Sequence, residues 1–373
     1  MTAFARTDTR LLSQWWWSVD RWLVTALAAI VSLGVVLVLA AAPPAAARMG
    51  LDSFQLVERQ LAYLALAVAI LLGVSLLSPA GVRRLALLGL AGALALLALT
   101  PLAGVEINGA RRWLYLAGVS VQPAELVKPV LAVSAAWLMA LPRRGESVPG
   151  DFAALVLVAL TAGLLMAQPD LGQTLLVAAT WGAQLFVAGL AWVWVAAGGA
   201  VVLAGMVAAY ATLPYVAERI DAFLAPGTAS YQVDRALTAF ERGGLLGTGP
   251  GEGTVKASLP DAHADFILAV AGEEFGGVVC AAIVGLFAFV VLRGFVRLLQ
   301  DDNLFVVLAG TGLLTSFGLQ AAINMGSTLH LIPTKGMTLP LVSYGGSSLV
   351  GVALAMGMLV ALTRRGRSPE GEA

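Results

Sequence analysis

Cysteine and histidine are almost absent from this chain of 373 residues. The single cysteine, Cys280, excludes an internal disulfide and any cysteine-based zinc or iron–sulfur site. The two histidines, His263 and His330, argue against a histidine-rich metal site. The 22 basic residues balance the 22 acidic ones, which excludes a basic nucleic-acid-binding protein and an acidic disordered tail. We therefore expect no nucleic-acid partner and assign no metal ligands.

Charged residues are also scarce, at 12% of the chain compared with ~25% in a typical soluble domain. Hydrophobic residues make up 59%, before the 41 glycines are counted. A soluble protein of this length cannot bury so much apolar surface. The composition therefore predicts an integral membrane protein.

Apolar runs of about 17–25 residues, long enough to cross the hydrocarbon core as helices, occur ten times. They are continuous rather than alternating, which excludes a β-barrel and predicts an all-α, polytopic membrane fold with ten transmembrane helices. Pro43 and Pro44 are expected to end the first helix. The ten runs cover 22–42, 60–77, 85–103, 124–141, 152–168, 171–189, 191–213, 266–292, 304–326 and 340–363.

Arginines gather in the short connections on one side of the predicted bundle, and the positive-inside rule makes that side cytoplasmic. Both termini then lie in the cytoplasm. We divide the chain into an amino-terminal segment (1–21), a membrane domain (22–363) and a tail (364–373). The arginines are Arg6, Arg10, Arg21, Arg83, Arg84, Arg143, Arg144, Arg293, Arg297, Arg364, Arg365 and Arg367.

Three polar segments fall on the opposite, outer side. The longest covers about 214–265, between the seventh and eighth helices, and begins with an alternation typical of an amphipathic helix lying on the membrane. The other two cover 104–123 and 327–339. Long connections between helices are usually functional, so the outer face is the expected place of activity.

Charged side chains in the first outer segment allow two interpretations. Glu125 and Lys128 share one face at the start of a helix, either as a pair stabilised by the helix dipole or as ionisable groups at membrane depth that mark a site. Arg111 and Arg112 could hold phosphates or meet lipid headgroups.

Asp265 directly precedes the eighth predicted helix, beneath the long outer loop. It could cap the helix or act as a general base at the membrane surface. A helix N-terminus lowers the pKa of a carboxyl and burial raises it, so the sequence leaves this pKa open. Glu273 and Glu274 follow two to three turns later, and we expect at least one to face a polar interior; solvation by headgroups is the alternative for Glu273.

Other polar motifs favour structural roles. The glycines between 243 and 254 lack the Gly-Lys-Ser/Thr pattern, the GxGxxG register and the preceding strand of a phosphate loop, so close packing explains them better. Asp170, with Gln173 three residues later, has capping-box spacing. The small residues 343–348 follow two prolines and Lys335, which favours an unwound turn at a cavity over close helix packing.

Taken together, these motifs resemble the SEDS family of bacterial membrane proteins, in its FtsW/RodA group. The matching stretches are INGARRW (107–113), QPAELVK (122–128), QPDLG (168–172), AFERGGLLGTG (239–249), LPDAHADFILAVAGEEFG (259–276) and PTKGMTLPLVSYGGSS (333–348). The last is more similar to the division branch of the family than to its elongation branch. Three departures concern the loop: Ala264 stands where the family usually has threonine, residues 251–256 lack the usual Asn-Ser-Val-Gln-Lys pattern, and the outer loop is somewhat short.

The resemblance implies a peptidoglycan glycosyltransferase that polymerises lipid II at the outer face of the bacterial inner membrane, at the division site. It implies a class B penicillin-binding protein and other division proteins as partners, with undecaprenyl pyrophosphate as leaving group and membrane lipid around the helices. The family's essential acidic residue falls on Asp265. We expect contacts to the pyrophosphate or sugars of lipid II from Arg111, Trp113, Glu125, Lys128, His263, Lys335 and Ser343.

Forming a β-linkage from an α-linked donor inverts the anomeric carbon, so one base and stabilisation of the leaving pyrophosphate suffice. Asp265 is our expected general base. Lys128, Arg111 or Lys335 would stabilise the leaving group, and a divalent cation, Mg²⁺ or Mn²⁺, held partly by carboxylates is an open addition.

Two other functions fit the same composition. A lipid II flippase would predict paired broken helices from inverted repeats, and the halves of this chain show no convincing repeat. A non-enzymatic division scaffold would predict that Asp265 and Glu125 are dispensable.

Overall fold

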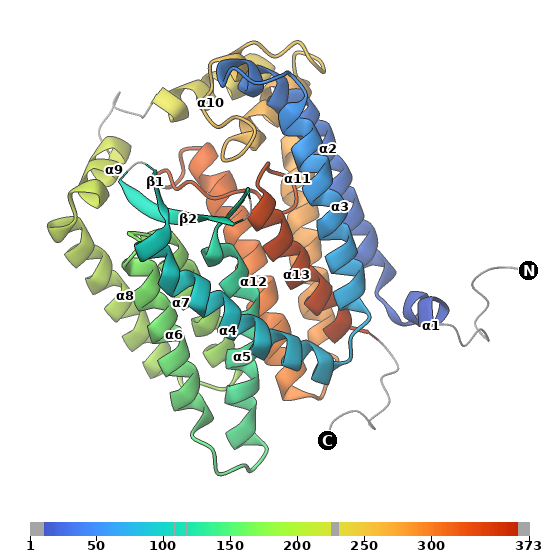
Figure 1. Cartoon of the computed structure of the whole chain (residues 1–373), viewed down its shortest axis with the longest axis vertical. Coiled ribbons are helices and arrows are strands. Elements are labelled where there is room, and N and C mark those ends of the chain that lie inside the picture. The colour runs from blue at the N-terminus through green and yellow to red at the C-terminus, as the bar shows by residue number, and fades with distance from the viewer. Residues whose placement is uncertain (1–10, 108, 117, 225–230, 365–373) are drawn as a thin grey trace, which may run out of the picture.

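The computed structural model describes residues 11–107, 109–116, 118–224 and 231–364 (Figure 1). Parts of the expected terminal segments lie outside these residues. The residues named above that fall outside the described ranges are Arg6, Arg10, Asn108, Arg365 and Arg367.

Each of the ten apolar runs coincides with a helix of the described chain. Seven of these helices are long and apolar enough to cross a membrane: α2 (Arg21–Arg48), α3 (Gln55–Ser75), α4 (Pro79–Ala103), α5 (Pro123–Arg143), α8 (Trp192–Thr212), α11 (Ile267–Leu298) and α12 (Leu304–Thr328). Three are apolar but have 17 residues each: α6 (Gly150–Met166), α7 (Leu171–Val187) and α13 (Gly346–Leu362). The all-α membrane class is confirmed, and the count of ten crossings stays a prediction.

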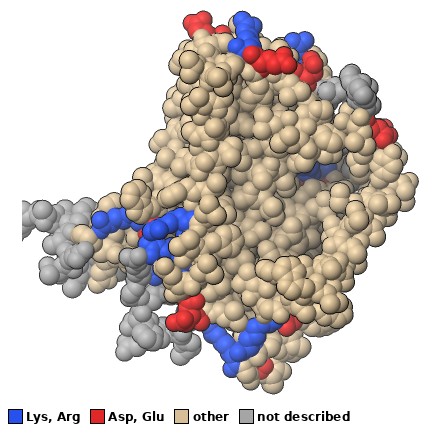
Figure 2. Space-filling view, turned by 180° about the vertical axis from the view of Figure 1, so that it is seen from behind, with Lys and Arg blue, Asp and Glu red and all other residues tan. Residues whose placement is uncertain are grey.

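Charge is distributed as a membrane protein requires. On the face that Figure 2 shows, most acidic and basic side chains gather towards the two ends, and the broad surface between them is uncharged except for a basic side chain inside a hollow. At one end, the short helix α1 (Leu11–Ser18) contacts both α3 and the end of α13: Trp15 Nε1 donates to Ser75 Oγ at 2.9 Å, and Arg364 Nε donates to Ser18 Oγ at 2.9 Å. The first and last described residues therefore lie at the same end of the bundle.

Helix α2 corrects one prediction, because it continues through Pro43 and Pro44 to Arg48. A proline removes one main-chain donor, which costs a helix less near its end than in its middle. Ala45 and Ala46 in this last turn are fully buried, so packing stabilises the turn that the prolines weaken. The helix then ends at Met49, whose N–H bonds back to Ala45 and Ala46.

Helices α5 and α12 form the buried centre of the bundle, and both contact α7 and α13 (Figure 1). Their small residues permit this close approach: a methyl group added to Gly312 of α12 would lie 2.4 Å from Gln184 Nε2 of α7. Helix α8, in contrast, is almost entirely exposed and lies at the periphery. Its surface is available to lipid.

A small antiparallel sheet, which the sequence analysis did not predict, lies between α4 and α5 at the end of the bundle that is predicted to face outward, called the outer end below. Its strands are β1 (Val105–Ile107), β2 (Ala110–Leu116) and β3 (Val119–Val121), paired in the order β1-β2-β3. The two hairpins turn at Gly109 and Gly118, whose φ angles are 74° and 83°. An Asn-Gly pair in a sequence is a strong hairpin signal, and the pair that ends at Gly109 could have predicted the first hairpin.

The long outer connection contains two amphipathic helices, α9 (Pro214–Leu224) and α10 (Tyr231–Gly243), and a short 3₁₀ turn, η1 (Val255–Ala257). The expected helix at its start is thus confirmed as α9. Helix α10 packs along the start of α11. The connection therefore covers one outer end of the bundle and leads the chain to Asp265.

Candidate active site

A cavity of about 1210 Å³ lies at the outer end of the bundle, where helices α3, α5, α7 and α13 meet the small sheet and the loops before α11 and after α12. Seven charged residues line it: Arg59, Arg112, Glu125, Asp170, Asp261, Asp265 and Lys335. The three outer segments singled out in the sequence all contribute to the lining. Their convergence makes this cavity the candidate active site.

Asp265 is half-buried in the wall of the cavity, two residues before α11 begins. Phe266 occupies the N-cap position and no side chain caps the helix, so the capping interpretation of Asp265 is wrong. Burial raises the pKa of the Asp265 carboxyl, the charge of Asp261 and, less strongly, that of Glu125 raise it too, and Lys335 lowers it, so that together they bring it to about 7. A carboxyl with this pKa can accept a proton near neutral pH.

Glu125 and Lys128 form a buried ion pair at the start of α5. Lys128 Nζ lies 2.9 Å from Glu125 Oε2, and the two residues are only 6% and 4% exposed, respectively. Gln173 Nε2 donates to the other oxygen of Glu125 at 2.7 Å, and Lys128 Nζ donates to Gln320 Oε1 at 2.7 Å. This burial favours a site at membrane depth over a surface pair. Glu125 lines the cavity, and Lys128 lies beneath it.

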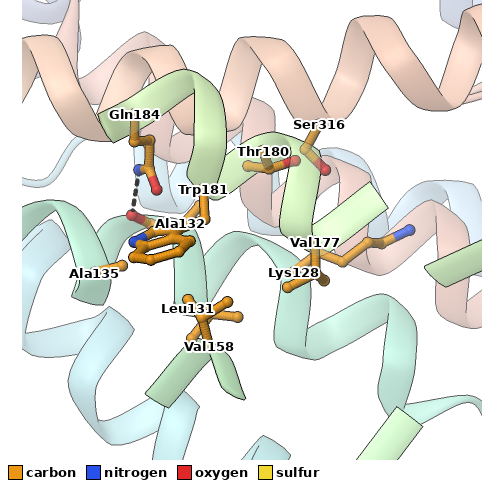
Figure 3. A pocket seen from close by; sticks show the side chains of 10 residues that line it. All are labelled: Lys128, Leu131, Ala132, Ala135, Val158, Val177, Thr180, Trp181, Gln184 and Ser316. Atoms are coloured by element: carbon orange, nitrogen blue, oxygen red, sulfur yellow. Dashed lines mark hydrogen bonds between the residues drawn. The ribbon is translucent and has the colours of Figure 1, made fainter. Parts of the chain in front are cut away.

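Behind Lys128 lies a second, much smaller pocket, shown in Figure 3. It has a volume of about 10 Å³, which holds about one water molecule and no sugar. In this view the ammonium of Lys128 points away from Gln184, whose Nε2 donates to the Ala132 carbonyl at 2.7 Å. The large outer cavity is therefore the only one of the two that can admit a substrate.

Lys335 reaches the cavity wall as an ion-paired side chain. Its Nζ lies 2.6 Å from Asp170 Oδ1, while Arg112 Nε lies 3.9 Å from Asp170 Oδ2 and donates to the Gln168 carbonyl at 3.2 Å. Asp170 also accepts from the main-chain N–H of Gln173 at 3.3 Å, which confirms the predicted cap of α7. Asp170 thus holds the positively charged side chains of Lys335 and Arg112 at the cavity wall.

The remaining predicted site residues divide between the cavity wall and its surroundings. Trp113 lines the cavity. Arg111 instead faces outward, 3.6 Å from Glu106, with about half of its side chain exposed. Arg111 therefore does not contribute to the cavity wall, and its contact with lipid headgroups stays a prediction.

Ser343 and His263 are buried behind the wall. Ser343 Oγ donates to the Ala264 carbonyl at 2.6 Å, and the main-chain N–H of Tyr344 donates to the His263 carbonyl at 2.8 Å. The ring centroids of His263 and Tyr344 are 5.1 Å apart. Burial lowers the pKa of His263, with Arg48 acting in the same direction and Asp261 against it. Because its imidazole is buried and neutral, His263 is better suited to supporting the loop that carries Asp265 than to binding a pyrophosphate.

Glu273 and Glu274 are both fully buried, which excludes headgroup solvation for Glu273. The carboxylate of Glu273 accepts from the main-chain N–H groups of Thr254, Val255 and Lys256 at 2.7–2.9 Å. Glu274 pairs with the side chain of Lys256. Both therefore hold the outer loop onto α11.

The glycine-rich loop packs closely, as predicted. Helix α11 is broken at Gly276, where φ is 81° and ψ is 177°, and a methyl group there would lie 2.4 Å from the Gly247 nitrogen. The carbonyls of Glu273 and Glu274, freed by the break, accept from the N–H groups of Thr248 and Gly249 at 2.9 and 3.0 Å. The loop thus replaces the hydrogen bonds that the helix loses.

Several cavity residues were not among the predicted site residues. Arg59 and Tyr63 of α3, Asp261 before α11 and Gln173 of α7 all line the cavity. Arg59 could have been found, because an ionisable residue at the edge of a predicted span is costly and marks a site by default. Tyr63 carried no comparable signal.

The comparisons with known proteins agree with this architecture. The model of the FtsW/RodA/SpoVE family, described as a cell cycle protein, matches residues 21–368. The chain belongs to this family. A relative from Caulobacter vibrioides, named a probable peptidoglycan glycosyltransferase FtsW, is 43% identical over 97% of this chain and 94% of that protein. One from Coxiella burnetii with the same name is 35% identical over 92% and 96%.

Solved structures of the FtsW/RodA/SpoVE family share the fold. A chain from a study of the structural coordination of polymerization and crosslinking by a peptidoglycan synthase complex matches with a TM-score of 0.75 and 32% identity, covering 92% of this chain and 97% of that one. The rod shape determining protein RodA of Thermus thermophilus matches with a TM-score of 0.68 and 31% identity, covering 93% and 97%.

Proposed function

We propose that this chain is a peptidoglycan glycosyltransferase that polymerises lipid II into glycan strands at the outer face of the bacterial inner membrane during cell division. The observation that carries the proposal is Asp265, a half-buried carboxyl with a pKa of about 7 in the wall of a cavity of about 1210 Å³. The two curated relatives described above bear the name of this activity.

The chemistry requires one base and no second carboxylate nucleophile. As the acceptor sugar hydroxyl attacks the anomeric carbon of the donor, a C–O bond forms and the bond to the pyrophosphate oxygen breaks. The electron pair leaves with undecaprenyl pyrophosphate, and the hydroxyl proton passes to Asp265. A positioned base of this kind typically contributes ~10²–10⁴-fold to the rate. The anomeric configuration inverts because attack and departure occur on opposite faces.

Cations around the cavity would stabilise the charge that develops on the pyrophosphate. Lys335 and Arg112 line the cavity beside Asp170. Arg59 of α3 also lines it, and Lys128 lies beneath Glu125. Trp113 in the cavity wall would contact the sugars, whereas Arg111 faces outward beside Glu106. His263 and Ser343 would support the loop that carries Asp265.

A divalent cation, Mg²⁺ or Mn²⁺, is an optional addition. In the described part of the chain no three His, Cys, Asp or Glu side chains gather closely enough to hold a metal ion. Asp261 and Asp265 both line the cavity, and Mg²⁺ is commonly held by one or two carboxylates together with substrate phosphates. Such an ion would supply positive charge to the pyrophosphate.

The lipid tail of the substrate needs a way into the bilayer. Helix α8 makes few contacts with the bundle, and on that side of the molecule Figure 2 shows a hollow with a basic side chain inside it. We infer that the tail lies between the helices there, with its pyrophosphate in the cavity.

The partners and topology follow from the family and the charge pattern. We infer a class B penicillin-binding protein as the crosslinking partner, together with other division proteins, and both termini in the cytoplasm. The domain organisation is a cytoplasmic segment 1–21, a membrane domain 22–363 with its outer loop at 214–265, and a cytoplasmic tail 364–373. The resemblance to a chain of a peptidoglycan synthase complex supports the partner.

A glycan-polymer gel tests the proposal. The purified protein and its class B partner are given lipid II and a divalent cation, beside Asp265→Asn and Asp234→Asn, a matched control at an exposed position of helix α10. We expect long strands from the wild type and the control, and at least about 100-fold less from Asp265→Asn. Full polymerisation by Asp265→Asn would exclude this base.

Lipid transport is the alternative. It predicts paired broken helices, and among the described helices only α11 contains a residue with non-helical dihedral angles. If the folded wild type and its partner make no polymer, movement of lipid II across vesicles becomes the experiment that decides. If neither activity is found, a division scaffold is the remaining interpretation.

A further inference from the structure

One face of helix α12 carries three polar residues spaced four apart: Gln320, Asn324 and Thr328. All three are buried, with exposed fractions of 2%, 0% and 0%. Residues four apart lie one above the other on a helix, so the three form a single row. The row contacts the segment 335–338 and also Asp265.

Asn324 joins the two segments that form this part of the cavity wall. Its Nδ2 donates to the carbonyl of Asp265 at 2.8 Å and to the carbonyl of Met337 at 2.6 Å. Both acceptors are main-chain oxygens, so the amide fixes the backbone at each position. Thr328 Oγ1 adds a longer contact of 3.4 Å to the same Asp265 carbonyl.

One helical turn before Asn324, Gln320 joins Lys128 to the segment 335–338. Its Oε1 accepts from Lys128 Nζ at 2.7 Å, and its Nε2 donates to the Thr338 carbonyl at 3.1 Å. The row therefore ties the Glu125–Lys128 pair, the 335–338 segment and Asp265 to one rigid helix.

We propose that Asn324 is a positioning residue for the glycosyl transfer, because its two hydrogen bonds set the place of Asp265 relative to the segment that carries Lys335. This inference rests on the proposed role of Asp265 as general base. Asn324 does not line the cavity, so it acts through Asp265 and contributes no group to the substrate.

The carboxylate of Asp265 packs closely against Gly336. A methyl group added to Gly336 would lie 2.8 Å from Asp265 Oδ2, so the carboxylate lies directly against the 335–338 segment. A shift of about 1 Å at a reacting group can cost roughly 100-fold in rate. Releasing one end of the Asn324 bridge would let the carboxylate move by such a distance.

The first experiment measures kcat and KM for lipid II in the complex with the class B partner, for the wild type and Asn324→Leu. Leucine fills a similar volume and cannot donate a hydrogen bond. We expect kcat to fall roughly 10–100-fold, while KM changes less than about threefold, because the substrate contacts are intact. The matched control is Thr311→Val, a buried residue lower on the same helix, which we expect to retain the wild-type kcat.

A second variant keeps the proposal testable if Asn324→Leu does not fold. Gly336→Ala leaves Asn324 in place and pushes on the Asp265 carboxylate, and we expect the same fall in kcat with little change in KM. An unchanged kcat in Asn324→Leu, or in Gly336→Ala if the first is unfolded, would overturn the proposal.

Asp265→Asn, measured in parallel, separates this inference from the proposed function. If Asp265→Asn polymerises normally, the base assignment fails, and the positioning role fails with it. If Asp265→Asn is inactive while Asn324→Leu has the wild-type kcat, only the positioning role fails.

Discussion

Lys335 Nζ lies 2.6 Å from Asp170 Oδ1, although the two residues are 165 positions apart in the chain. The aliphatic part of Lys335 passes directly over Gly172, where an added methyl group would lie 2.1 Å from Lys335 Cε. Asp170 thus both caps α7 and pairs with Lys335, whose side chain lines the cavity. This contact holds the loop after α12 against the start of α7.

Replacing Gly172 with alanine should displace Lys335. Because the clashing atom belongs to a flexible side chain, we expect thermal stability to change little, while polymerisation falls roughly tenfold as the ammonium leaves its place. Gly163→Ala in α6, where the added methyl group meets no atom within 4 Å, is the matched control. Rates and melting temperatures of both variants check this, and equal activity would contradict it.

The pH dependence of polymerisation should report Asp265. A general base must be deprotonated, so kcat/KM, which reports the free enzyme, should rise with pH up to about 7, the pKa of Asp265, and level off above it. Lys335 lowers this pKa, whereas Asp261 and Glu125 raise it, so Lys335→Met should move the midpoint to higher pH. The kcat/KM profile is measured from pH 5 to 9 at lipid II concentrations below KM. A flat profile would argue against Asp265 as the base.

The stability of the fold should change with pH in the direction opposite to activity, because of the same carboxyl of Asp265. The pKa of its carboxyl rises from 3.8 to about 7 in the fold, so the folded protein favours the protonated form. Stability therefore falls as pH rises from about 4 to about 7 and stays lower above. Asn cannot ionise, so Asp265→Asn should melt at a higher temperature than the wild type at pH 8 and show little difference at pH 4. A variant that is less stable at pH 8 would contradict the cause given for this pKa.

The buried pair of Glu125 and Lys128 should show strong coupling in a double-mutant cycle. Removing one partner leaves an uncompensated buried charge, which typically costs about 3–5 kcal/mol. Glu125→Gln combined with Lys128→Met should recover most of that stability without recovering polymerisation. The exposed pair Arg143–Asp151 is the control, and Asp151→Asn should cost no more than about 1 kcal/mol. Additive effects at the buried pair would show that it is not coupled.

Much of the candidate site could be predicted because its residues occur in short polar motifs between apolar runs. Glu125, Asp265, Lys335 and Trp113 line the cavity as expected. Arg111, Lys128, His263 and Ser343 occur in the same motifs and lie behind or outside the wall. A motif indicates which segment reaches a site, whereas the direction of each side chain depends on its neighbours in the fold.

The sequence by itself determined the membrane class and the places of the ten apolar helices. This is so because each spanning helix must satisfy its own backbone in lipid, which makes the signal local. The cap of α7 by Asp170 is local for the same reason. Only the tertiary structure decided the pairing of Asp170 with Lys335, the bridge from Asn324 to Asp265 and the raised pKa of Asp265. These depend on burial and on charges brought together from distant segments, which no local pattern specifies.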